Sequence, residues 1–134
     1  MRRVKAVIER AGDGTYSIYS DADDLTYLIT GTGNTLKEAK QCFEDGYLDM
    51  KRYYMEEGKE FTEVEMYYVY DLGSFLSYYA KVISLAGLAK LTGIKIPQLK
   101  LYITGKNTPT PRTAKKILDR IHAFAEDLAT CQTA

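Results

Sequence analysis

Residues 85–104 read LAGLAKLTGIKIPQLKLYIT, and this stretch decides the fold of the second half of the chain. Two helices that cross closely need a small residue where they touch, which Ala89 provides. The turn between them needs a backbone position that can adopt a left-handed conformation, which Gly93 provides. The side chains that must pack on neighbouring helices are Leu88, Thr92, Ile94, Leu99 and Tyr102. The pattern therefore predicts a helix-turn-helix.

The segments around this motif also have helical patterns. We expect helices at residues 72–81, 85–91, 96–103 and 112–129. Pro111 suits the first position of the last helix, because its missing amide hydrogen would be unbonded there, and Thr110 can cap that helix. The second half is therefore predicted to contain helices only.

The first half alternates between apolar and polar residues, as strands do. We expect strands at residues 4–9, 15–20, 25–30 and 63–70, with a hairpin turn at residues 12–14. Thr35 and Glu38 form a capping box that starts a helix ending near Gly58. The order β-β-β-α-β predicts one sheet covered by one helix, and the whole chain is predicted to be α+β, with domains at residues 1–71 and 72–134.

Charge is divided unequally between these two halves, although the net charge of the chain is zero. Residues 1–71 carry nine Lys and Arg against fifteen Asp and Glu, whereas residues 72–134 carry nine against three. The balances are −6 and +6. Two solvated surfaces can differ in this way by chance, but the division also suits a basic half that binds a polyanion and an acidic half that binds a basic protein.

The second helix of the motif has an outward face poor in side chains that read bases. With Leu99 at the centre of the buried face, Pro97, Leu101 and Thr104 point outward, and neither Pro97 nor Leu101 can form the paired hydrogen bonds of base readout. Several Lys and Arg side chains in and near this helix can contact phosphate groups. Lys115 and Lys116 are expected to lie too far round the last helix to take part in these contacts. The predicted DNA-binding residues are Lys95, Pro97, Gln98, Lys100, Leu101, Thr104, Lys106, Asn107 and Arg112.

Short motifs in both halves point to one family. The N-terminal motifs are Asp13-Gly14-Thr15-Tyr16, Thr30-Gly31-Thr32-Gly33-Asn34-Thr35 and Leu36-Lys37-Glu38-Ala39. The C-terminal motifs are residues 85–91, Gly93-Ile94, Tyr102-Ile103-Thr104-Gly105 and Pro109. With these motifs the N-terminal half resembles the antitoxin HicB of type II toxin–antitoxin pairs, and the second half is similar to the phage-repressor type of helix-turn-helix that many of these antitoxins carry.

The resemblance implies two activities. The first domain, a partial RNase H-like fold in this family, is expected to bind and block a small basic mRNA-cleaving toxin of the HicA type, and the second to bind operator DNA and repress the operon. The predicted toxin-binding residues are Asp21, Asp23 and Asp24. They stand in Asp21-Ala22-Asp23-Asp24-Leu25, where the family often has a Pro-Asp-Leu-Pro-Gly-like stretch. The alternative is a stand-alone transcription regulator whose first domain senses a ligand or dimerises.

We expect no enzymatic activity, cofactor or metal. The three aspartates are adjacent in one loop rather than gathered from separate strands, His122 has no predicted catalytic partner, and Gly31-Thr32-Gly33-Asn34 lacks the lysine of a phosphate-binding loop. No signal peptide or membrane span is predicted, so the expected location is cytoplasmic. A homodimer or higher oligomer is expected through the edge of the fourth strand or through Ile117, Ile121, Phe124 and Leu128.

Overall fold

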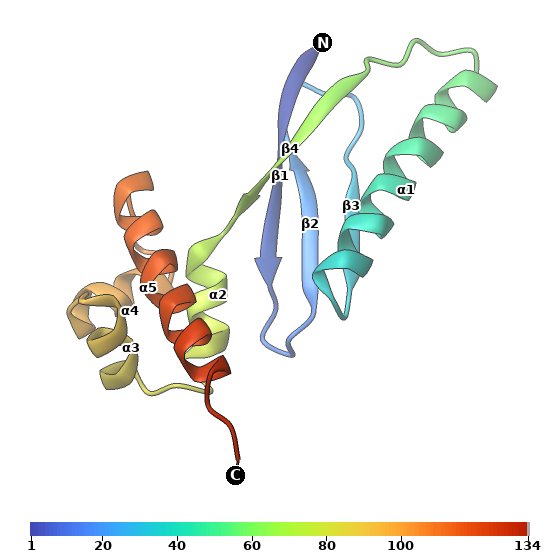
Figure 1. Cartoon of the computed structure of the whole chain (residues 1–134). Helices are drawn as coiled ribbons and strands as arrows, with labels where there is room; N and C mark the ends of the chain where they lie inside the picture. Colours follow the sequence, from blue (N-terminus) through green and yellow to red (C-terminus); the bar gives the residue numbers. More distant parts are fainter. Residues whose placement is uncertain (134) are drawn as a thin grey trace. The chain divides into compact units, whose positions relative to one another are not determined.

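The structure is a computed structural model that describes residues 1–133, and its fold is mixed α+β, as expected. The chain divides into two compact units, Met1–Asp71 and a second that begins at Leu72 (Figure 1). The first unit contains β1 (Arg2–Arg10), β2 (Tyr16–Asp21), β3 (Thr30–Gly33), α1 (Leu36–Glu56) and β4 (Val64–Tyr70). The second contains α2 (Leu72–Tyr79), α3 (Leu85–Thr92), α4 (Ile96–Ile103) and α5 (Pro111–Ala129).

The first unit is a four-stranded sheet with the order β3-β2-β1-β4. β1 pairs antiparallel with β2 and parallel with β4. A parallel pair needs a long crossover connection, and α1 lies within that connection, packed on one face of the sheet (Figure 1). The β1–β2 turn is held by Asp13, whose carboxylate accepts hydrogen bonds from the Thr15 amide at 2.9 Å and from its hydroxyl at 2.7 Å.

The core of this unit lies between the sheet and α1. Alternate residues of β1, namely Val4, Ala6 and Ile8, are buried because successive side chains of a strand point to opposite faces. On α1, Ala39 and Phe43 are buried; they are four residues apart and therefore lie on one face of the helix. The sheet face that α1 covers is therefore the apolar face of the first unit.

The third strand is not where the sequence predicted it. The prediction was residues 25–30, but β3 runs over Thr30–Gly33 and pairs with β2 through Gly31 and Ile18. Tyr27 and Ile29 are buried outside any strand, and their burial explains the alternating pattern that predicted one. The Tyr27 hydroxyl donates a hydrogen bond to the Thr62 carbonyl oxygen at 2.7 Å. Gly31 and Gly33, which lie beyond the predicted strand, belong to β3, and the absence of side chains there lets α1 approach the strand closely.

α1 begins as predicted but its capping box differs in one bond. The Thr35 hydroxyl accepts a hydrogen bond from the Glu38 amide at 3.1 Å. The Glu38 carboxylate, however, accepts from the Asn34 amide at 3.0 Å rather than from Thr35. The helix ends at Glu56, close to the predicted end near Gly58.

β4 forms one edge of the sheet. The hydroxyl group of Tyr47, on α1, accepts a hydrogen bond from the Val64 amide at 3.1 Å and lies 3.3 Å from the Val64 carbonyl oxygen, to which it donates. These bonds use the main-chain groups at the start of β4. An unpaired strand edge is a template for another strand, so this contact shortens the edge that a second copy could use.

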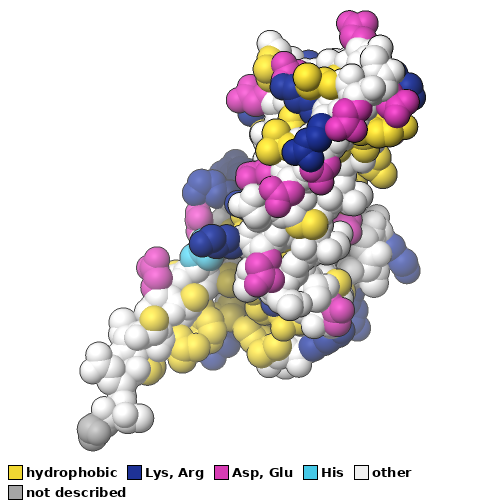
Figure 2. Space-filling model, turned by 90° about the vertical axis from the view of Figure 1, so that its right-hand side faces the viewer, with side chains coloured by type: hydrophobic (Ala, Val, Ile, Leu, Met, Phe, Trp, Pro, Cys, Tyr) yellow, Lys and Arg dark blue, Asp and Glu magenta, His cyan; other side chains and the backbone are white. Residues whose placement is uncertain are grey.

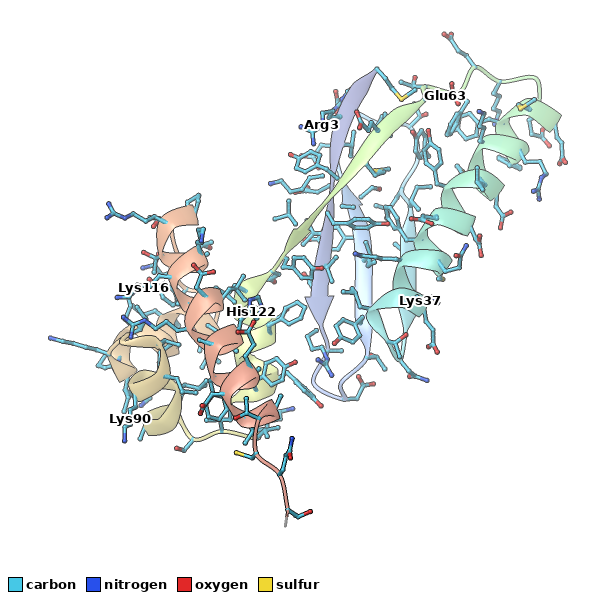
Figure 3. All side chains as sticks on the ribbon, in the orientation of Figure 1. Arg3, Lys37, Glu63, Lys90, Lys116 and His122 are labelled. Atoms are coloured by element: carbon cyan, nitrogen blue, oxygen red, sulfur yellow. The ribbon has the colours of Figure 1, made fainter. Side chains whose placement is uncertain are left out.

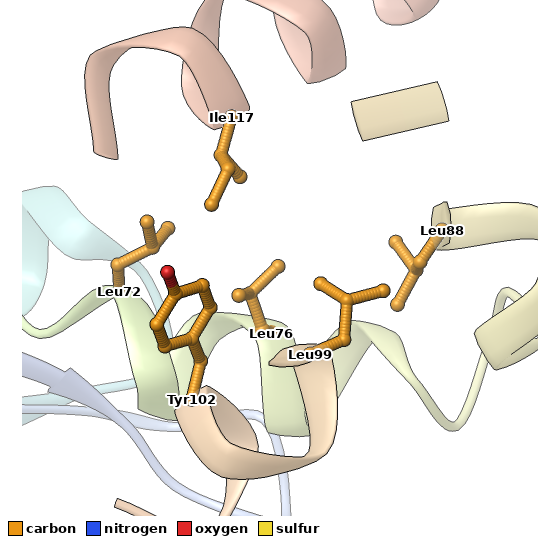
Figure 4. Packing of buried hydrophobic residues seen from close by; sticks show 6 residues of the cluster. All are labelled: Leu72, Leu76, Leu88, Leu99, Tyr102 and Ile117. Carbon is orange, nitrogen blue, oxygen red and sulfur yellow. The ribbon is translucent and has the colours of Figure 1, made fainter. Parts of the chain in front are cut away.

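The second unit packs its helices around one apolar cluster. Figure 4 shows the six side chains at its centre: Leu72, Leu76, Leu88, Leu99, Tyr102 and Ile117. Ile117 is fully buried in this cluster, so it is unavailable for the dimer contact that the sequence suggested for it. Further along α5, Phe124 and Leu128 are 36% and 56% exposed. Among residues 1–133, no helix combines the length and apolar character needed to cross a membrane.

Candidate nucleic-acid interface

α3 and α4 are joined by a short turn whose geometry depends on Gly93. Gly93 has φ of 72°, and its amide donates to the Ala89 carbonyl oxygen at 2.9 Å. A side chain at a left-handed position is sterically unfavourable, so glycine suits this one. The Thr92 hydroxyl donates to the Leu88 carbonyl oxygen at 2.7 Å and accepts from the Ile94 amide at 3.2 Å. These bonds fix the path of the chain from α3 into α4.

α4 turns one face inward and the opposite face to solvent. Leu99 and Tyr102 are buried in the core of the second unit, whereas Pro97 and Thr104 are exposed and Leu101 is 37% exposed. The predicted orientation of α4 is therefore confirmed. The Thr104 hydroxyl donates to the Lys100 carbonyl oxygen at 2.8 Å, so it can act only as an acceptor while that bond holds.

Exposed cations surround the outward face of α4. Lys95 precedes the helix and has no side-chain capping bond, Lys100 lies within it, and Lys106 follows it. Asn107 and Arg112 are also exposed, and Gln98 is half-buried. The side chains of these four cations form no hydrogen bond or ion pair with another residue of the described chain. They are free to contact phosphate groups.

The sequence prediction missed two further cations beside the turn. A Cβ built on Gly93 would lie 3.7 Å from Nζ of Lys116 and 4.0 Å from Nη1 of Arg120. Lys116, which was expected to lie too far round the last helix to join the phosphate contacts, therefore lies beside the turn that leads into α4. Figure 3 labels Lys116 on α5 and Lys90 on α3, both at the surface of the second unit. The spacing of Arg112, Lys116 and Arg120 by four residues was the available signal.

The three aspartates proposed for the toxin contact do not act as one group. The Asp24 carboxylate is bound by the Arg2 guanidinium at 2.7 Å, a hydrogen bond that lowers the pKa of Asp24 below its ordinary value. Asp21 stands opposite Lys5 in the β1–β2 register. Asp21 and Asp23 are exposed, but the charge of Asp24 is already compensated by a neighbour.

Another acidic grouping lies on the sheet face opposite to α1, around Tyr19. Tyr19 is half-buried, and burial raises its pKa, with further contributions from the negative charges of Glu9, Asp21 and Asp71. Those carboxylates come from β1, from β2 and from the end of β4. Elsewhere on the first unit, Asp and Glu side chains are spread among Lys and Arg over the α1 side (Figure 2).

Groups suited to metal binding do not gather in the described chain. Within residues 1–133, no group of three or more His, Cys, Asp and Glu side chains could hold a metal ion. His122 is exposed on α5, and the thiols of Cys42 and Cys131 are exposed and unpaired.

Comparison with known proteins adds no identification, because no family model, curated protein or solved structure matches the chain.

Proposed function

We propose that this protein is an antitoxin-type regulator of the HicB kind, which binds DNA through its second unit and blocks a small basic toxin through its first. The observation that carries the proposal is the division of charge. Residues 1–71 have a balance of −6 and residues 72–134 a balance of +6, and the border coincides with the division into compact units at Asp71 and Leu72. Surfaces of opposite charge suit two partners of opposite charge.

The DNA-binding part of the proposal rests on α3, the Gly93 turn and α4. In a helix-turn-helix, the second helix enters the major groove while the flanking groups contact phosphates. α4 has an exposed face and four surrounding cations without partners in the described chain. Because Pro97 and Leu101 occupy that face, we expect apolar contacts to thymine methyl groups and readout of DNA shape, rather than paired hydrogen bonds to bases.

The toxin-binding part of the proposal rests on the acidic surface of the first unit. Tyrosine is enriched at the centres of protein interfaces, and charges around it set the preferred partner. Tyr19, with Glu9 and Asp21 nearby, combines both features for a basic partner. Asp21 is the last residue of β2 rather than a loop residue as predicted, so we extend the proposed toxin contact from Asp21 to the neighbouring face of the sheet.

The test is co-expression of this chain with the product of the adjacent reading frame. The expected neighbour is a small basic protein with a single histidine, which arrests growth alone and co-purifies with this chain. A second experiment measures binding of the purified protein to its own promoter DNA. Promoter binding without rescue or co-purification would favour the stand-alone regulator, whereas absence of both activities would refute the whole proposal.

A further inference from the structure

Three cations form a row along one side of α5. Arg112, Lys116 and Arg120 are separated by four residues each, a spacing that brings helical side chains to the same face. At 1.5 Å per residue, the row extends over about 12 Å of the helix axis. In the part of the chain that the structure describes, the side chains of these three residues have no hydrogen-bond or ion-pair partner.

Asp119, the carboxylate of α5 that lies among these cations in the sequence, is already engaged by another residue. Asp119 accepts a hydrogen bond from Nζ of Lys115 at 2.7 Å, so Lys115 is the paired cation of this segment. The row lines an open depression of about 420 Å³ together with Lys115, Asp119 and Ala123. Four cations and one carboxylate therefore surround this depression, which favours an anionic ligand.

The row also reaches the turn before α4. Nζ of Lys116 and Nη1 of Arg120 lie 3.7 Å and 4.0 Å from the position that a Cβ on Gly93 would occupy. Gly93 comes three residues before the start of α4. A ligand held by Lys116 and Arg120 would thus lie beside the turn that leads into the helix proposed to enter the groove.

The fold alone does not account for all three cations. Lys116 and Arg120 can interact favourably with the C-terminal end of α3, where the helix dipole is negative. Arg112, by contrast, lies in the first turn of α5, which contains no acidic residue, and a cation is unfavourable at that end of a helix. Like charges four residues apart repel each other as well. A polyanion bound along the row would remove this repulsion.

We propose that Arg112, Lys116 and Arg120 form a phosphate-binding row for the backbone of duplex DNA, flanking the groove that α4 occupies. The inference rests on the DNA binding proposed above and extends it to α5. Each cation that neutralises a phosphate releases a counterion, so the row adds affinity and salt dependence rather than sequence choice. One strand has a phosphate about every 3.4 Å along the duplex axis, so the row spans several of them.

The experiment uses the full chain and its promoter DNA, with Lys116→Gln and Arg120→Gln as test variants and Lys37→Gln as the matched control. Each test variant is expected to lose roughly tenfold in affinity at about 0.1 M salt and to reduce the slope of log K against log salt by about one. The control makes the same change in net charge and is expected to leave both unchanged, because Lys37 is exposed on α1 in the first unit, outside the proposed interface. Lys116→Arg keeps the positive charge, so it is expected to have the same slope of log K against log salt as the parent protein.

The thermal midpoint of each variant separates binding from a purely structural role. The proposal expects the midpoints to stay close to that of the parent protein while the slopes change. Unchanged slopes in Lys116→Gln and Arg120→Gln, or an equal change in Lys37→Gln, would overturn the inference and leave the proposed DNA binding intact. Absence of promoter binding by the folded parent protein would instead refute the proposed function.

Discussion

The backbone of Gly31 in β3 lies directly against Phe43 in α1, so that a Cβ on Gly31 would fall 2.4 Å from the Phe43 backbone nitrogen. No heavy atom can approach backbone so closely without displacement. We predict that Gly31→Ala separates β3 from α1 and lowers the free energy of unfolding by about 1–3 kcal/mol, the usual cost of overpacking. Urea or thermal unfolding of the full chain measures the change.

The matched control for that prediction is Gly46→Ala in α1. A Cβ there would lie 3.4 Å from the Thr30 carbonyl oxygen and 3.5 Å from Cγ2 of Ile29, which is ordinary contact. Because alanine is favoured over glycine in helix interiors by up to about 1 kcal/mol, we expect no loss of stability or a small gain. Equal destabilisation by both substitutions would contradict the proposed close contact at Gly31.

The ion pair between Arg2 and Asp24 predicts the titration of one carboxyl group. The hydrogen bond from Arg2 lowers the pKa of Asp24 below its ordinary value of 3.8. The associated stabilisation is present above the unfolded pKa and is lost as the pH falls through the folded pKa. NMR titration is expected to give a low pKa for Asp24 in the parent protein and a value near 3.8 in Arg2→Ala. An unshifted Asp24 in the parent protein would disprove the pairing in solution.

The left-handed turn at Gly93 predicts a backbone effect on stability. Gly93→Ala forces a Cβ into a conformation with φ of 72°, at a cost of about 1–2 kcal/mol. Gly93→Asn is expected to lose less, because asparagine adopts this conformation more readily. Thermal unfolding of both variants checks the order, and equal losses in Gly93→Ala and Gly93→Asn would argue against a left-handed turn.

The exposed position of Lys100 on α4 predicts a loss of DNA binding on charge reversal. Lys100→Glu removes a cation from the proposed interface and adds repulsion with phosphates, so we expect binding to the promoter to be abolished. Lys37→Glu, an exposed position on α1, makes the same change in net charge on the first unit and is expected to bind as the parent does. Gel-shift titrations between about 50 and about 200 mM salt measure both. Binding that survives Lys100→Glu, or does not depend on salt, would contradict the proposed docking of α4.

Local patterns predicted much of the fold. The spacing of apolar residues gave the helices of the second unit to within about two residues, which is the usual uncertainty of helix ends. Thr35 and Thr110 were identified as helix caps because a side-chain oxygen that accepts an orphan amide hydrogen is a local feature. The orientation of α4 also followed from periodicity alone.

Contacts between distant segments were not predictable in this way. Gly31 and Gly33 look like turn residues unless it is known that α1 packs on them, and the burial of Tyr27 and Ile29 imitates a strand. Asp24 looks like one of three acidic loop residues until Arg2, 22 positions away, is found beside it. Similarly, the sequence suggested Ile117 as an interface residue, but in the structure it is buried in the core of its own unit.

The sequence by itself determined the secondary structure of α3 and α4, the left-handed turn at Gly93 and the opposite charges of the two halves, because each depends on residue type and short-range spacing. Only the tertiary structure decided which cations lie together. Lys116 and Arg120 come from α5, more than twenty residues after Gly93, and packing of α5 against α3 brings them to the turn. Short-range patterns describe a helix face, but the neighbour of that face is selected by the packing of the whole unit.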